Sequence, residues 1–108
     1  MLPLDLRNKY LNVIKRIVKM NFREEEVPAF LEVFEASKQA IGSFPGCQHL
    51  ELLQSKSEKN ILFTFSVWEN EAALENYRQS ELFITTWRKT KVLFAEKAEA
   101  WTLEMLHP

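Results

Sequence analysis

The sequence contains few cysteine, histidine and glycine residues. Its 108 residues include one cysteine, two histidines and two glycines. A single thiol, Cys47, cannot form an internal disulfide and cannot build a cysteine-based zinc site alone. The two imidazoles, those of His49 and His107, are far apart in the sequence, and no glycine-rich phosphate loop is present. We therefore expect no metal and no other cofactor.

Long apolar runs and a dominant charge are also lacking. The longest nearly uninterrupted apolar run, 61–68, is far shorter than the ~20 residues of a transmembrane helix. Residues 1–7 lack the pattern of a secretory signal. The 14 basic and 15 acidic residues leave a net charge of −1, which gives no field that attracts nucleic acid or anionic lipid. We expect a cytoplasmic protein without nucleic-acid or membrane partners.

The apolar content is sufficient for one core. Apolar residues make up 46% of the chain and aromatic residues 12%, and the length is that of one domain. We assign residues 1–11 to an N-terminal extension and residues 12–108 to a single domain.

Strand-like and helix-like patterns alternate along the first half. Residues 12–22 have a β-branched centre, which predicts a strand. Glu24–Glu26 and Pro28 suit the first turn of a helix, which apolar residues at helical spacing continue to Gly42. Residues 47–55 and 61–68 flank a polar segment, and together they predict a hairpin.

The second half adds a helical region and a last strand. Asn70 and Ser80 are good N-cap residues, so we expect two helical segments that separate near Ser80. The second segment includes three rings at helical spacing, those of Phe83, Trp87 and Phe94. Alternation over residues 98–106 predicts the last strand.

This order of elements predicts a ferredoxin-like α+β fold, β-α-β-β-α-β, with one antiparallel sheet and helices on one face. The strands at 12–22 and 61–68 are apolar at both parities, so the face without helices should also be buried. A homodimer that packs sheet against sheet would bury it. The basic residues of the first strand, Lys15, Arg16 and Lys19, we expect to be solvated.

Seven short motifs between Lys15 and Leu106 carry a family resemblance. In chain order they are Phe44–Cys47, Leu50–Leu52, Ser66–Glu69, Ala72–Leu74, Tyr77, Ser80–Phe83 and Lys97–Trp101. Their order and spacing resemble those of the antibiotic biosynthesis monooxygenase family, also described as quinol monooxygenases. The resemblance implies a dimeric α/β barrel.

The resemblance also implies an activity. Relatives that oxidise phenols need no metal or flavin, because the ionised substrate supplies the electrons. It therefore implies a cofactor-independent monooxygenase that combines a quinol or polyphenolic small molecule with molecular oxygen. Two alternatives remain: a non-catalytic small-molecule-binding or stress-related dimer, and a small-molecule isomerase, for which no phosphate-binding cluster is visible.

The resemblance supplies most candidate site residues. Trp68 matches a pocket tryptophan that can stack on a substrate and donate a hydrogen bond, although it could equally be a core residue. Tyr77 stands where many relatives have a histidine, and with an ordinary pKa of ~10 it is a poor base. Ser66 shares the strand face of Trp68, and Phe83 and Trp87 complete an aromatic-lined cavity.

His49 is a candidate general base, since an imidazole is the side chain whose ordinary pKa suits proton transfer near neutrality. The alternative is a place at the dimer interface or on a solvated face. By the two-residue period of a strand, Cys47 should lie on the same face as His49, as a small buried residue.

The haem-degrading branch of the family implies a different set of residues. Its asparagine, tryptophan and axial histidine fall on Val18, Trp68 and Trp87 of this sequence. Since neither Val18 nor Trp87 can ligate iron, we expect no haem.

Overall fold

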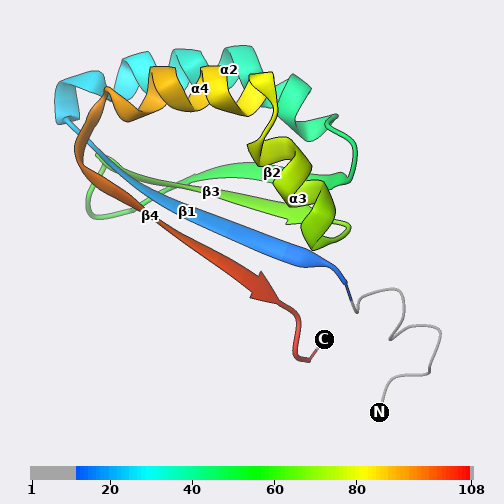
Figure 1. Ribbon diagram of the computed structural model, residues 1–108. Helices are drawn as coiled ribbons and strands as arrows, with labels where there is room; N and C mark the ends of the chain where they lie inside the picture. The colour runs from blue at the N-terminus through cyan, green and yellow to red at the C-terminus, as the bar shows by residue number, and fades with distance from the viewer. Residues whose placement is uncertain (1–11, 108) are drawn as a thin grey trace.

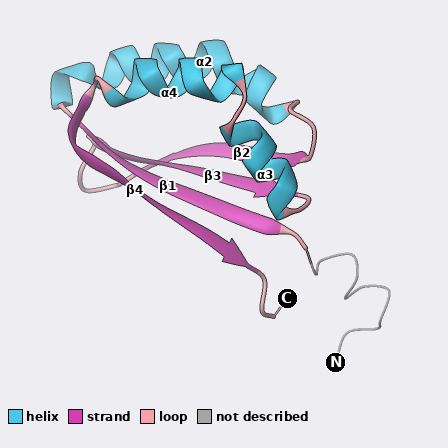
Figure 2. Cartoon of the chain, in the orientation of Figure 1, coloured by secondary structure: helices cyan, strands magenta, loops and turns pink. Residues whose placement is uncertain are grey.

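The computed structural model describes residues 12–107, which form a four-stranded antiparallel sheet with helices on one side (Figures 1 and 2). The strand order is β2-β3-β1-β4, so β2 and β4 are open edges. The expected extension, residues 1–11, lies outside the described residues, and the domain boundary stays a prediction. The elements are β1 (Ile14–Phe22), η1 (Glu24–Glu26), α2 (Val27–Gly42), β2 (Cys47–Gln54), β3 (Ile61–Trp68), α3 (Glu71–Arg78), α4 (Glu81–Lys91) and β4 (Phe94–Glu104).

The predicted ferredoxin-like α+β fold is therefore confirmed, with every strand pair antiparallel. The two predicted caps are also confirmed. The side chain of Asn70 accepts a hydrogen bond from the backbone N–H of Ala73 at 2.8 Å, and that of Ser80 accepts one from Phe83 at 3.1 Å. These caps start α3 and α4 separately, because each satisfies an N–H that the first helical turn leaves without a partner.

The boundary between α4 and β4 differs from the prediction. Phe94 does not continue the helix, because it begins β4 and pairs with Phe22 of β1. Its ring packs against the rings of Phe22 and Trp87, at centroid distances of 5.2 and 5.6 Å. Phe94 thus packs in the core as a strand residue, although its spacing from Phe83 and Trp87 also fitted a helix.

The helix-covered face of the sheet holds two separate clusters of buried residues. Ile14 and Trp68 form the first with residues of α3. Met20, Phe22 and Leu62 form the second with Phe30 of α2. The middle of this face, between the two clusters, is left for smaller or polar side chains.

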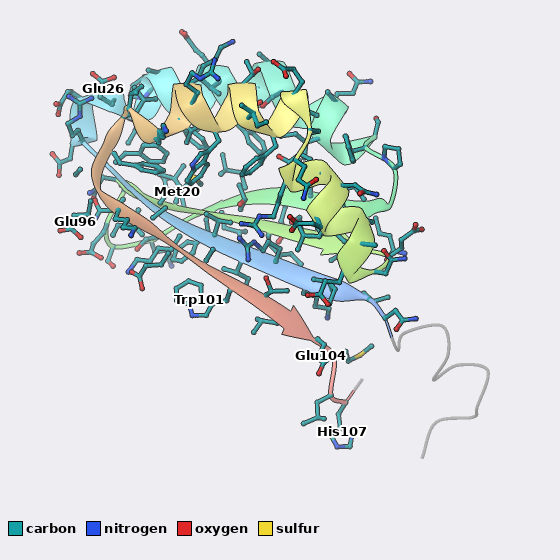
Figure 3. The ribbon with its side chains drawn as sticks, in the orientation of Figure 1. Met20, Glu26, Glu96, Trp101, Glu104 and His107 are labelled. Carbon is teal, nitrogen blue, oxygen red and sulfur yellow. The ribbon has the colours of Figure 1, made fainter. Side chains whose placement is uncertain are left out.

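The opposite face of the sheet carries no helix (Figure 1). Leu53, Trp101 and Leu103 lie there and are 43–47% exposed. Figure 3 shows Trp101 pointing away from the helices, whereas Met20 lies between helices and sheet. Among residues 12–107, no helix has the length and apolar character needed to cross a bilayer.

Candidate active site

A cavity of about 300 Å³ lies between the sheet and the helices. Small side chains of β3 and β4, namely those of Thr64, Ser66, Ala98 and Ala100, form part of its floor, beside Arg16, Val18 and Met20 of β1. The two core clusters lie on either side of this floor. The volume falls at the lower end of the range for small-molecule sites. Small residues at the centre of the sheet thus leave space where a continuous core would have large ones.

Aromatic side chains from three elements wall the cavity. The indole of Trp68 stacks on the ring of Tyr77 with centroids 4.9 Å apart and planes inclined by 23°. Tyr77 meets Phe83 edge to face at 5.3 Å, and Phe83 stacks on Trp87 at 6.0 Å. All four residues line the cavity. The structure therefore brings together the aromatic residues that the sequence indicated, in a series of rings that suits a flat, apolar ligand.

Trp68 is fully buried, and its N–H already has a partner. The indole nitrogen donates to the Ser66 hydroxyl oxygen at 3.0 Å. The N–H that we expected to donate to a substrate is thus engaged by Ser66 in this structure, and substrate binding by Trp68 stays a prediction. Because a hydroxyl accepts and donates at once, Ser66 can accept from Trp68 and still offer its own proton to a ligand in the cavity.

Tyr77 keeps its proton at neutral pH. Burial, and to a smaller extent the neighbouring Cys47, raises the pKa of Tyr77 to about 12. Desolvation disfavours the phenolate, so the phenol can donate a hydrogen bond at neutral pH but cannot accept a proton as a base. The role of Tyr77 in binding a substrate stays a prediction.

His49 lies on the other face of the sheet, away from the cavity. It pairs with Val67 across the β2–β3 ladder, and its Nε2 lies 2.7 Å from a carboxylate oxygen of Glu51. Cys47 instead pairs with Trp68 and packs in the first core cluster. The expectation that Cys47 and His49 share a face is wrong, because a bulge between them inserts one residue and reverses the alternation.

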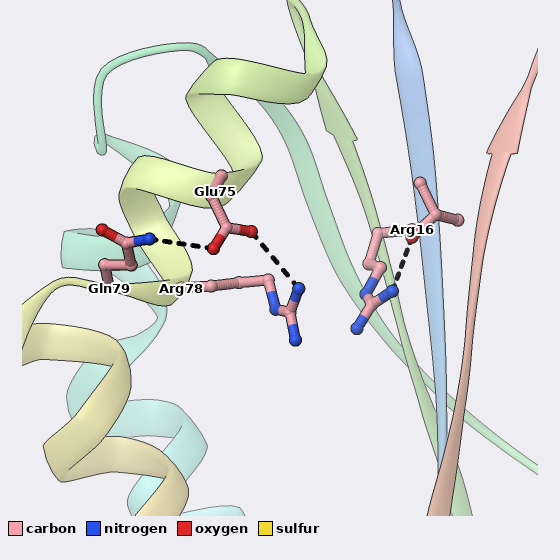
Figure 4. A network of polar contacts seen from close by, with 5 residues as sticks. Arg16, Glu75, Arg78 and Gln79 are labelled. Carbon is pink, nitrogen blue, oxygen red and sulfur yellow. Dashed lines mark hydrogen bonds and ion pairs between the residues drawn. The ribbon is translucent and has the colours of Figure 1, made fainter.

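Two arginines also line the cavity. Arg16 was expected to be solvated, and Arg78 was not among the predicted site residues. Arg16 of β1 faces the helices and donates to the Thr102 hydroxyl, and Arg78 of α3 pairs with Glu75 at 3.4 Å (Figure 4). Burial and the nearby charge of Arg78 lower the pKa of Arg16, whereas Glu75 raises it. The alternation of the strand could have indicated this placement, since Arg16 lies two residues after the apolar Ile14 and so on the same face, whereas Lys15 lies on the other face.

The polar side chains of the cavity are hydroxyls and guanidinium groups. No histidine or carboxylate of the described residues is among those that line it. Within residues 12–107, no three side chains of histidine, cysteine, aspartate or glutamate lie close enough together to bind one metal ion. The site as described can stack, donate hydrogen bonds and attract negative charge, and it presents no side chain that would accept a proton at neutral pH.

The sequence matches the antibiotic biosynthesis monooxygenase family over residues 13–89, which is more than half of the chain. The protein belongs to this family. No protein with a curated description matches it. The resemblance seen in the motifs is thus confirmed at the level of the family.

Solved structures of low sequence identity share the fold of this family member. A conserved protein from Methanosarcina mazei Go1 is 16% identical, with a TM-score of 0.85, over 90% of this chain and 96% of that chain. Rv0793 from Mycobacterium tuberculosis is 18% identical, with a TM-score of 0.82, over 89% and 97%. SnoaB from Streptomyces nogalater, described as a cofactor-independent oxygenase, is 16% identical, with a TM-score of 0.79, over 90% and 96%.

Proposed function

We propose that this protein is a monooxygenase that oxidises a quinol or related polyphenol without a metal or flavin. The observation that carries the proposal is the cavity itself. Its floor is made in part of small side chains, its wall consists of stacked rings, and it contains a hydroxyl donor, Ser66, which a buried indole holds in place. Membership of the family and the description of SnoaB as a cofactor-independent oxygenase support the same reaction class.

The reaction converts a quinol and molecular oxygen into a hydroxyquinone and water. One oxygen atom enters the ring, and the other leaves as water with the two hydrogens that the quinol loses. The electrons come from the ionised, electron-rich ring of the substrate. In this proposal the protein holds the ring flat against the wall, and Ser66 hydrogen-bonds one substrate oxygen. A fixed donor at developing negative charge lowers the barrier more than a mobile water does.

We further propose that the working unit is a homodimer joined through the uncovered face of the sheet. Leu53, Trp101 and Leu103 are exposed there, and Phe63 and Phe65 are only partly buried. An apolar surface of this kind on an isolated subunit marks an interaction site. Two sheets packed face to face would produce the dimeric barrel.

Oxygen uptake with a panel of hydroquinones tests the activity. Ser66→Ala should lower turnover by about tenfold to a thousandfold, the usual effect of losing one positioned donor. Ser55→Ala is the matched control, because Ser55 lies in the β2–β3 turn and outside the cavity. Uptake that does not depend on Ser66 would retain an oxygenase but reject this site, and uptake at the buffer level for every quinol would reject the activity.

One observation favours a second function, that of a binding protein without catalysis. No side chain lining the described cavity accepts a proton at neutral pH, and the pKa of Tyr77 lies at about 12. A dimer that binds aromatic molecules would need no proton acceptor. The same assay separates the two functions, since saturable quinol binding without oxygen uptake would establish the second.

A further inference from the structure

The placement of Arg16 is the least expected feature of the cavity. Its strand neighbours on the helix-covered face are Ile14 and Val18, and its cross-strand partner on β3 is the buried Ser66. A guanidinium group in such a place usually has a carboxylate partner, because removing its charge from water is costly. Among residues 12–107, Arg16 forms no ion pair, and its one side-chain hydrogen bond is to the neutral Thr102 at 2.6 Å.

A second guanidinium group, that of Arg78, adds to the same charge. Its side chain extends from α3 toward β1 (Figure 4), where it lines the cavity together with Arg16. The carboxylate of Glu75 binds Arg78 at 3.4 Å and the amide of Gln79 at 3.0 Å. Two positive charges and one negative charge therefore leave one positive charge uncompensated beside the cavity.

The arginines also lie at the open part of the site. The side chain of Arg78 is 46% exposed, whereas Trp68 at the inner wall is fully buried. Ala100 of β4 lines the cavity and is itself exposed, so the cavity opens over β4 on the side of Arg16. A ligand whose ring lies against the aromatic wall would thus place a substituent between the two guanidinium groups.

We propose that the cavity takes an aromatic ligand that carries one carboxylate, bound by Arg16 and Arg78 at the opening. A carboxylate matches the fork of a guanidinium group, and its single charge balances the single excess charge, whereas a phosphate dianion would exceed it. This inference rests on the proposed function, because it names the substrate class of the same cavity. The inference narrows the proposed substrates from quinols and polyphenols in general to those that carry a carboxylate.

Binding of two matched probes tests the inference without turnover. 1-Hydroxy-2-naphthoate and 1-hydroxy-2-naphthamide have the same rings and hydroxyl group and differ in the charge of one substituent. Neither is a quinol, so calorimetric titration at pH 7.5 measures binding alone. The wild type should bind the carboxylate about tenfold to a hundredfold more tightly than the amide, the range of a charge-assisted hydrogen bond. The preference should shrink as salt screens the charges.

Variants locate the source of this preference. Arg16→Gln and Arg78→Gln should each lose most of the preference for the carboxylate and leave amide binding within about twofold. Arg16→Lys should retain part of it, because the charge remains but the fork is lost. Arg88→Gln is the control, since it removes the same charge from an exposed position of α4 outside the cavity.

Several results would overturn the inference. The first two are equal binding of the two probes by the wild type and no binding of the carboxylate at millimolar concentration. The third is tighter binding of 1-naphthyl phosphate than of 1-naphthoate. The fourth is a loss of the preference for the carboxylate in Arg88→Gln as large as that in Arg16→Gln. The probe comparison on the wild type stands even if a variant fails to fold. Charge-selective binding without oxygen uptake would reject the proposed activity alone, whereas uptake of neutral quinols without charge-selective binding would reject this inference alone.

Discussion

The two faces of the sheet hold the same kinds of residues and place them in different surroundings. On the helix-covered face, Trp68 is fully buried, stacks on Tyr77 and donates to Ser66. On the uncovered face, Trp101 is 43% exposed and is paired across the ladder with Ile17. A tryptophan in a strand can therefore belong to a cavity wall or to an exposed surface, and the two are told apart only when it is known whether helices cover that face of the sheet. The helices, and not the strand pattern, decide between the two.

Charged residues show the same contrast. On the uncovered face, the Lys19 ammonium lies 4.0 Å from the Glu99 carboxylate, and Nε2 of His49 lies 2.7 Å from a carboxylate oxygen of Glu51. On the covered face, Arg16 has no carboxylate partner among residues 12–107. A guanidinium group without a carboxylate partner beside a cavity suits an anionic ligand.

The comparison predicts opposite consequences for the two tryptophans. Trp68→Ala should lower the free energy of unfolding by about 3–5 kcal/mol, the range for removing a large buried aromatic residue. Trp101→Ala should lower that of the monomer by less than about 1 kcal/mol, as for most exposed positions. Urea denaturation at several protein concentrations separates unfolding from dissociation. Similar losses for both variants would contradict the distinction between the faces.

Trp101 should matter instead for association. Trp101→Glu places a charge in the proposed sheet-to-sheet interface, and it should raise the dimer dissociation constant by about thirtyfold or more, as at an interface hot spot. Val92→Glu is the control, because Val92 is 62% exposed but lies at the end of α4. Sedimentation equilibrium measures both. A wild type that stays monomeric at micromolar concentration would refute the dimer.

The order of elements was readable from the sequence because each local signal agreed with the fold. Alternation marked the strands, and Asn70 and Ser80 marked the start of the two helices. The two-residue period of a strand predicted Ser66 and Trp68 on one face, and this is confirmed because no bulge separates them. The placement of His49 could not be predicted, since the bulge after Cys47 depends on the pairing of β2 with β3. The role of Arg16 was missed because its basic neighbours suggested a solvated strand.

The raised pKa of Tyr77 predicts a pH dependence of stability. The folded pKa is about 12 and the unfolded pKa ~10, so above pH 10 the unfolded chain ionises first and gains stability relative to the folded state. The contribution is fully present below pH 10 and is lost as the pH rises toward 12. The free energy of unfolding of the wild type should therefore fall, relative to that of Tyr77→Phe, by about 2 kcal/mol between pH 9 and 11.5. Parallel curves over this range would show that Tyr77 titrates normally.

The smallest effect is expected for His49, the candidate base that lies outside the cavity. Its side chain and that of Glu51 are 48% and 43% exposed, and a contact between two side chains this exposed contributes less than about 1 kcal/mol. His49→Gln keeps a hydrogen-bonding side chain on the uncovered face, so oxygen uptake should change by less than about twofold. The measurement is turnover with the best quinol substrate, beside Ser66→Ala as the variant expected to lose activity. A tenfold loss in His49→Gln, with the dimer intact, would mean that the histidine reaches a reacting group after all, and that the site includes the face which this structure leaves uncovered.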